Sequence, residues 1–255
     1  MMTKERSGAA RHDYLVKGGA VITVDPKLGT LPKADVLIRG GTIVEVGASL
    51  ASDTAEVVDA TNMIAMPGFV DSHTHMWSTL GRNFVSDGFG YYPAKWATAE
   101  LYEPEDFYNS LMLGFAELAD GGVTTVHNWS HNNRSPRHVD AELQAHKDSM
   151  LRARYSIGHI DRLPPNIVNK FDDLARVQKE WFADPSRLDH LVHLGLNLRG
   201  MVQSEAAVFH EEMQFALRRR LQCAFTPAKL DQTLTMPGTT NAVVILAHSS
   251  YFLTT

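Results

Sequence analysis

Two histidines stand two residues apart in the stretch GFVDSHTHMW, residues 68–77. The apolar residues before them predict a β-strand, and side chains two apart on a strand point to the same face. We therefore expect His73 and His75 to share one face at the end of that strand. Because neutral imidazole is a common ligand of zinc and related ions, the pair predicts a site for one divalent metal. Asp71 is interpreted as a structural strand-end residue or as a carboxylate that supports the ligands.

The composition limits the classes of partner. The chain has 255 residues, a formal net charge of −5 and a single cysteine, Cys223. The mild acidity gives no basic footprint, so we expect no nucleic-acid partner, and no segment is long and apolar enough to predict a membrane span. One cysteine excludes an intramolecular disulfide and a cysteine-rich zinc site, which fits a reducing cytoplasm. A small-molecule substrate is the expected partner, and a homo-oligomer is left open.

The rhythm of the sequence changes near residue 66. Before it, four short segments rich in β-formers alternate with turn residues: 14–24, 34–39, 42–46 and 56–59. This pattern predicts a small all-β domain over residues 1–66. A second domain is expected over residues 67–255.

In the second region, apolar strand patterns alternate with helical ones. Strands are expected at 68–73, 123–128, 154–160, 191–198, 222–225 and 242–248. The connection 76–103 is expected to be a long aromatic loop, and helices are expected to begin at Pro104, Ser135, Asn169 and Ser204, the third of them running over 169–183. Alternation of this kind predicts a parallel sheet, either an open doubly wound sheet or a (β/α)8 barrel.

Polar residues favour the barrel over the open sheet. They stand at the carboxyl ends of the predicted strands, where the loops of a barrel converge on one mouth. No glycine-rich phosphate fingerprint follows any strand, which weakens the case for a dinucleotide-binding sheet. The residues concerned are His73, His75, His127, Asn128, His159, Arg199 and His248.

These residues lie in stretches that resemble the amidohydrolase superfamily. PGFVDSHTHM resembles the first-strand motif of that family, and the segments from DYLVKGGAVITVD to the motif resemble its N-terminal β-sandwich. GGVTTVHNWSH, LGLNLRG and LAHSSYFLT resemble its second, fourth and sixth strands, the last two in the cytosine deaminase and triazine hydrolase branch. The resemblance implies an α/β fold, an incomplete TIM-type (β/α)8 barrel with a small N-terminal β-sandwich.

The resemblance also implies roles for the strand-end residues. His73 and His75 match the metal ligands of one divalent ion, zinc above iron or manganese. His248 matches a catalytic histidine beside the activated water or the substrate. His127, Asn128 and Arg199 are expected to line the substrate pocket, with strand-end hydrogen bonding as the alternative for all three.

The activity implied is hydrolysis of non-peptide C–N bonds by metal-activated water. The reaction would be deamination or hydrolysis of a small, cyclic substrate. Two alternatives stay open: a catalytically dead barrel that serves as a scaffold, and a metal-dependent esterase-like hydrolase.

The sequence also departs from the family pattern. The family expects a histidine at the end of the fifth strand and an aspartate at the end of the eighth. Here LQCAFTPAKL places Thr226 near the histidine position, with no carboxylate until Asp231, and the chain ends at Thr255. We therefore expect a fragment, or the product of a frame slip or early stop, with unpaired strand edges and little or no hydrolase activity.

Overall fold

The protein is described by a computed structural model that covers residues 12–82, 85, 88, 90–200, 203–225, 243–247 and 250–254. The chain divides into two compact units, Met1–Gly68 and Phe69–Thr255, and each is considered by itself. Within the described residues, no helix combines the length and the apolar character needed to cross a lipid bilayer.

The N-terminal unit is a β-sheet, as its alternating sequence predicts. Strand β1 (Tyr14–Ile22) pairs antiparallel with β2 (Thr30–Arg39), which pairs antiparallel with β3 (Thr42–Gly47). On its other side β1 pairs in parallel with β4 (Glu56–Asp59) and β5 (Ile64–Ala65). The described part of this unit therefore forms one five-stranded sheet in the order β3-β2-β1-β4, with β5 beside β1.

A small apolar core and one buried carboxylate hold this sheet together. Val21, Ala34 and Val36 form the core, against which side chains from β1, β2, β3 and β5 pack. Asp35 is 4% exposed, and its two oxygens accept hydrogen bonds from the backbone N–H groups of Gly18 (2.8 Å) and Leu50 (2.9 Å). A buried carboxylate is tolerated here because both of its oxygens have donors.

The second unit is built on a parallel sheet. Strands β6 (Phe69–Thr74), β7 (Val123–Ser130), β8 (Arg152–Ile157), β9 (Val192–Leu198) and β10 (Gln222–Phe225) are consecutive neighbours, and each adjacent pair is parallel. This curled sheet confirms the incomplete barrel. At its far edge β12 (Ser250–Thr254) pairs antiparallel with both β10 and β11 (Val243–Ala247). The strand expected at 242–248 thus does not lie directly beside β10, because β12 lies between them.

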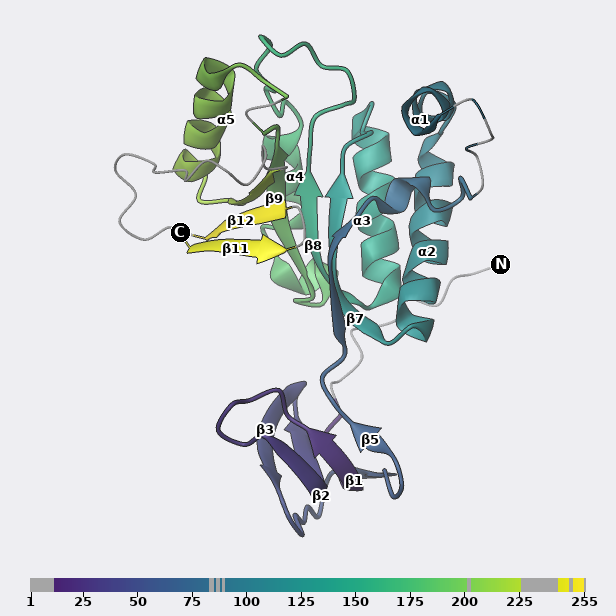
Figure 1. Cartoon of the computed structure of the whole chain (residues 1–255), viewed down its shortest axis with the longest axis vertical. Helices are drawn as coiled ribbons and strands as arrows, with labels where there is room; N and C mark the ends of the chain where they lie inside the picture. The colour runs from purple at the N-terminus through teal and green to yellow at the C-terminus, as the bar shows by residue number, and fades with distance from the viewer. Residues whose placement is uncertain are drawn as a thin grey trace. The chain divides into compact units, whose positions relative to one another are not determined.

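Helices connect these strands and bury their apolar stripes against the sheet. Helix α2 (Pro104–Asp120) begins with a capping box in which Glu103 and Asp106 bond each other's backbone N–H groups. It packs beside α3 (Pro136–Ser149), and both flank the strands in Figure 1. Helices α4 (Leu174–Trp181) and α5 (Ala206–Arg218) follow later in the chain, and there are two short 3-10 turns, η1 (Met76–Ser78) and η2 (Pro185–Leu188). The shared core contains Phe107, Leu111, Leu143, Val177 and Leu196.

Two expectations about the connections need correction. The stretch 76–103 contains a helix, α1 (Tyr91–Ala99), near the end of the sheet to which the parallel strands point in Figure 1. The third helix begins at Leu174 rather than at Asn169. Phe171 has a φ of 49°, a left-handed conformation that interrupts a right-handed helix. Residues 158–173 therefore form a long loop between β8 and α4.

Candidate functional site

His73 and His75 meet at the end of β6, on one side of the sheet. Their Nε2 atoms are 3.2 Å apart. His75 Nδ1 lies 3.0 Å from the carbonyl oxygen of Trp129, to which it donates, so the lone pair of the ring lies on Nε2 and faces His73. Asp71 Oδ1 accepts a hydrogen bond from the backbone N–H of His73 at 3.0 Å, which supports its structural interpretation.

Burial favours the neutral form of both rings, which is the form that binds metals. Burial lowers the pKa of His73, and it lowers the pKa of His75 to about 4. Two nitrogen ligands bound at 2.0–2.1 Å in tetrahedral geometry are roughly 3.3 Å apart. The observed 3.2 Å separation of the two Nε2 atoms therefore fits one shared ion, and the hydrogen bond from His75 to Trp129 is the support that ligating histidines commonly have.

Two ligands do not complete a metal site. In the part of the chain that the structure describes, no group of three His, Cys, Asp or Glu residues is placed to hold an ion. The predicted catalytic residue His248 lies outside the described residues, as do Thr226 and Asp231. The catalytic role of His248 therefore stays a prediction. The expectation that Thr226 stands near the position of the family's fifth-strand histidine stays one as well.

Strand β7 brings further rings to the same side as the histidine pair. Side chains alternate along a strand, so His127, Trp129 and the following His131 share one side, called here the histidine face. The ring of Trp129 is 4.6 Å from that of His73, and the ring of His131 is 4.4 Å from that of His75. His127 donates from Nδ1 to the Ser72 carbonyl (3.1 Å) and accepts at Nε2 from the Ser156 hydroxyl (2.8 Å). Burial lowers the pKa of His127 to about 4.

Asn128 lies on the opposite side of β7, called here the helix face. It is fully buried, and its Nδ2 lies 3.1 Å from His146 Nε2 on α3. The sequence groups Asn128 with His127 because the two are adjacent, but adjacent strand residues point to opposite sides. The structure therefore does not bring Asn128 to the histidine pair, and its predicted contact with substrate stays untested.

Arg199 is 1% exposed and is bonded to other parts of the fold. Its Nη2 lies 2.6 Å from Glu212 Oε1 on α5, and its Nη1 donates to the Pro164 carbonyl at 2.9 Å. A further bond joins Nη2 to the Ile167 carbonyl. These contacts connect the 158–173 loop to the end of β9 and to α5. They agree with the alternative given for Arg199, namely strand-end hydrogen bonding. Its predicted contact with substrate stays a prediction.

Three residues beside the pair went unassigned by the sequence: Lys95, His131 and Asp161. Lys95 Nζ on α1 is 2.7 Å from Asp161 Oδ2, and His131 Nε2 is 3.7 Å from Asp161 Oδ1. His131 stands two residues after Trp129, which stands two residues after His127. This two-residue spacing could have predicted from the sequence that His131 shares their side of the sheet. Nothing in the sequence signals Lys95, because it stands in a stretch expected to be a loop.

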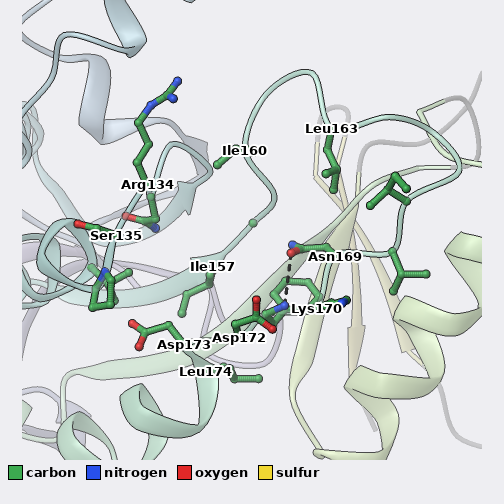
Figure 2. A pocket seen from close by; sticks show the side chains of 17 residues that line it. Arg134, Ser135, Ile157, Ile160, Leu163, Asn169, Lys170, Asp172, Asp173 and Leu174 are labelled. Atoms are coloured by element: carbon green, nitrogen blue, oxygen red, sulfur yellow. Dashed lines mark hydrogen bonds between the residues drawn. The ribbon is translucent and has the colours of Figure 1, made fainter.

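A separate cavity opens between the β7–α3 connection and the 158–173 loop (Figure 2). Its volume is about 450 Å³, and its lining contains none of His73, His75, His127 and His131. The Arg134 side chain extends away from the hollow in Figure 2, whereas Asp172 and Asp173 lie at its border. Asp173 is already paired with Arg176 at 2.7 Å. The cavity therefore offers space without the converging nitrogens found beside β6.

Comparison with known proteins agrees with this architecture. Residues 64–188, which contain β6, His73, His75 and the whole of β7, match the Amidohydrolase family. Over these residues, just under half of the chain, the protein is similar to that family. The histidine pair thus stands in the part of the chain that carries the family match.

Curated relatives of this chain are named as deaminases. It is 30% identical over 155 residues to the 5'-deoxyadenosine deaminase of Methanosarcina mazei, an alignment that covers 58% of this chain and 34% of the relative. It is 33% identical over 123 residues to the 5-methylthioadenosine/S-adenosylhomocysteine deaminase of Caldicellulosiruptor saccharolyticus, covering 44% of this chain and 28% of the relative. The matches thus span about a third of the length of these relatives.

Solved structures share the fold at low sequence identity. The zinc complex of atrazine chlorohydrolase from Arthrobacter aurescens has a TM-score of 0.65 at 20% identity, covering 82% of this chain and 52% of that one. An adenosine deaminase from Xanthomonas campestris with bound zinc has a TM-score of 0.61 at 20% identity, covering 83% and 48%. These likenesses show that the chain shares the fold of these structures.

Proposed function

We propose that the chain carries the metal-binding end of an amidohydrolase that acts on non-peptide C–N bonds of a small, cyclic substrate. The observation that carries this proposal is the pair of imidazoles whose Nε2 atoms face each other at 3.2 Å, one of them fixed by a backbone carbonyl. When bound, a zinc, iron or manganese ion supplies a water whose pKa is lowered toward about 7.

The residues of the chain divide the remaining work. His73 and His75 hold the ion, and the hydrogen bond from His75 to the Trp129 carbonyl keeps its Nε2 directed toward His73. The indole of Trp129, 5% exposed, packs against the rings of both His73 and His75 and excludes water from that side of the pair. His127 spans Ser72 of β6 and Ser156 of β8, which holds the neighbouring strands in register beneath the site. We retain His248 as the residue that contacts the reacting group.

The names of the curated relatives support deamination. They are described as acting on 5'-deoxyadenosine, 5-methylthioadenosine and S-adenosylhomocysteine. We therefore propose a substrate in which an exocyclic nitrogen is attached to a planar heterocycle. Water would replace that nitrogen, which leaves as ammonia.

Metal retention tests the proposal most directly. The purified chain is equilibrated with zinc, dialysed and analysed for bound metal, beside the double variant His73→Ala/His75→Ala. We expect the double variant to lose the bound metal, because it has lost both ligands. The matched control, His193→Ala/His210→Ala, removes two exposed histidines on β9 and α5 and should retain it. Equal zinc in the wild type and in the His73/His75 variant would refute the site.

Activity is then assayed on aminopyrimidines, aminotriazines and adenosine-like nucleosides with zinc, iron or manganese. We expect little or no turnover from this chain alone, since the described residues supply two ligands where a catalytic zinc site has three. Turnover that disappears with His73→Ala would support the assigned reaction and contradict the expectation of inactivity.

A further inference from the structure

Asp161 lies where three elements meet beside the histidine pair. It belongs to the 158–173 loop, and its Oδ2 is 2.7 Å from Lys95 Nζ on α1. Its Oδ1 is 3.7 Å from Nε2 of His131, the residue that follows β7. Lys95 and His131 are 8% and 4% exposed, so the carboxylate is the counter-charge of a buried ammonium and faces a buried ring.

The hydrogen bonds around Trp77 indicate how the His131 ring is protonated. The indole Nε1–H of Trp77 is buried, can only donate, and lies 3.4 Å from His131 Nδ1. His131 Nδ1 is also 3.3 Å from the Trp129 carbonyl, which could accept from it, but a proton on Nδ1 would leave the buried Trp77 N–H without the acceptor it has here. His131 therefore accepts at Nδ1 and carries its proton on Nε2, the atom directed toward Asp161.

The same ring packs against a proposed metal ligand. The ring centroids of His131 and His75 are 4.4 Å apart, with the planes at 75°. The orientation of His131 thus limits the rotation of His75, whose Nε2 must face His73 for the two to share an ion. Among the described residues, the ion-pair partners of Asp161 are Lys95 and His131, so apart from the long-range effect of its charge it reaches His75 through the ring of His131.

We propose that Asp161 is the positioning residue of the histidine pair: it fixes the ring of His131, which in turn holds the ring of His75 toward His73. The inference rests on the proposed metal site and adds to it a residue from the 158–173 loop, which contributes no ligand.

A purely structural alternative is that Asp161 only anchors α1. That helix has two other attachments, since Arg162 lies over the Trp96 ring at 5.3 Å and Asn132 Nδ2 donates to the Ala99 carbonyl at 2.9 Å. Removing the charge of Asp161 together with that of Lys95 should therefore leave α1 in place. The two roles are separable by experiment.

The experiment compares zinc affinity in Lys95→Met, Lys95→Met/Asp161→Asn and a control, Asp172→Asn. Asp172 is an exposed carboxylate of the same loop. We expect Lys95→Met and the control to bind zinc within twofold of the wild type. The double variant should bind about three- to tenfold more weakly, because supporting residues around a metal typically change affinity by about 10- to 100-fold and Asp161 acts through one more ring. Unchanged affinity in the double variant would overturn the proposal.

Two further readouts separate positioning from anchoring and from failure of the metal site. Hydrogen exchange of residues 91–99 should be the same in Lys95→Met and in the double variant, and faster exchange in the double variant would assign Asp161 to anchoring instead. In the metal-free wild type, ¹⁵N NMR should show His131 protonated on Nε2, and the double variant should lose this preference. If neither His73 nor His75 binds zinc, the proposed function fails, and the tautomer of His131 still decides whether Asp161 positions the ring.

Discussion

The two sides of β7 both carry buried polar groups, and they differ in what those groups do. On the helix face, the Glu142 carboxylate accepts hydrogen bonds from the Ser130 hydroxyl (2.5 Å) and the Tyr155 hydroxyl (2.7 Å). All three residues are fully buried. On the histidine face, His73 and His75 are half-buried and turn their Nε2 atoms toward each other.

This difference shows which features distinguish a candidate metal site from an internal network of buried polar residues. Burial and a perturbed pKa occur on both sides: desolvation raises the pKa of Glu142 to about 7 and lowers that of His75 to about 4. What separates the sides is accessibility together with convergence of atoms of one chemical type. The helix face is an internal network between sheet and helix, whereas the histidine face presents two nitrogens to one point.

Replacing Arg199 should have the largest effect on the free energy of unfolding. The variant also tests whether Arg199 belongs with the internal polar network or with the residues available to a substrate. Arg199→Met leaves the Glu212 carboxylate, 1% exposed, without its guanidinium partner. Breaking a buried ion pair in this way costs about 3–5 kcal/mol of the free energy of unfolding, measured by urea denaturation. Arg152→Met, which replaces an exposed arginine on β8, is the control. A loss below about 1 kcal/mol would show that the pair with Glu212 adds little stability, and Arg199 would again be a candidate for contact with substrate.

The helix face should be sensitive to pH through Glu142. Its pKa is raised by burial from 4.5 to about 7 in the folded state, so the folded protein is favoured while the carboxyl is protonated. This stability is fully present below about pH 4.5 and is lost as the pH rises through about 7. Between pH 5 and 8 we expect a loss on the order of 2–3 kcal/mol in the free energy of unfolding.

Glu142→Gln should remove that part of the pH dependence, because an amide does not ionise in this range. Glu211→Gln, an exposed glutamate on α5, should leave it in place. The measurement is urea unfolding at several pH values. An unchanged slope in Glu142→Gln would show that other groups carry the dependence.

Asn128→Ala sharpens the separation between the two sides. The variant removes the partner of His146 Nε2 and should lower the free energy of unfolding by about 2 kcal/mol, since a buried polar atom is left unpaired. Zinc affinity should stay within twofold, because Asn128 lies on the helix face. Zinc titration and urea unfolding of the same preparation test both statements, and a large loss of zinc affinity at full stability would contradict the division.

Gly195→Ala should have the smallest effect on the free energy of unfolding, and it acts on the histidine face. A Cβ at this position would lie 2.5 Å from the Ser156 hydroxyl, which bonds His127, and 3.1 Å from the Gln222 carbonyl. We expect a loss of about 1 kcal/mol in thermal or urea unfolding as Ser156 rotates away. Gly47→Ala meets only Leu50 at 3.7 Å and serves as the tolerated control. Equal stability of the two variants would show that the Ser156–His127 bond adjusts freely.

The sequence by itself determined the parallel strands β6 to β10 and the shared face of His73 and His75. The alternation of apolar strands with helical stripes indicated the parallel sheet, and the helix expected to begin at Pro104 is α2, which begins at that residue. The spacing of His73 and His75 predicted a shared face, because a strand repeats every two residues. These features are local, so neighbouring residues contain the information for them.

Only the tertiary structure decided which strand-end residues lie together. Alternation states that His127 and Asn128 face opposite ways, but the packing of α3 against β7 determined which of them faces the histidine pair. The partners of Arg199 and Asp161 come from other elements, Glu212 on α5 and Lys95 on α1. Pairs of this kind form only when the loops are placed by the whole fold, because no short-range period connects the residues that meet.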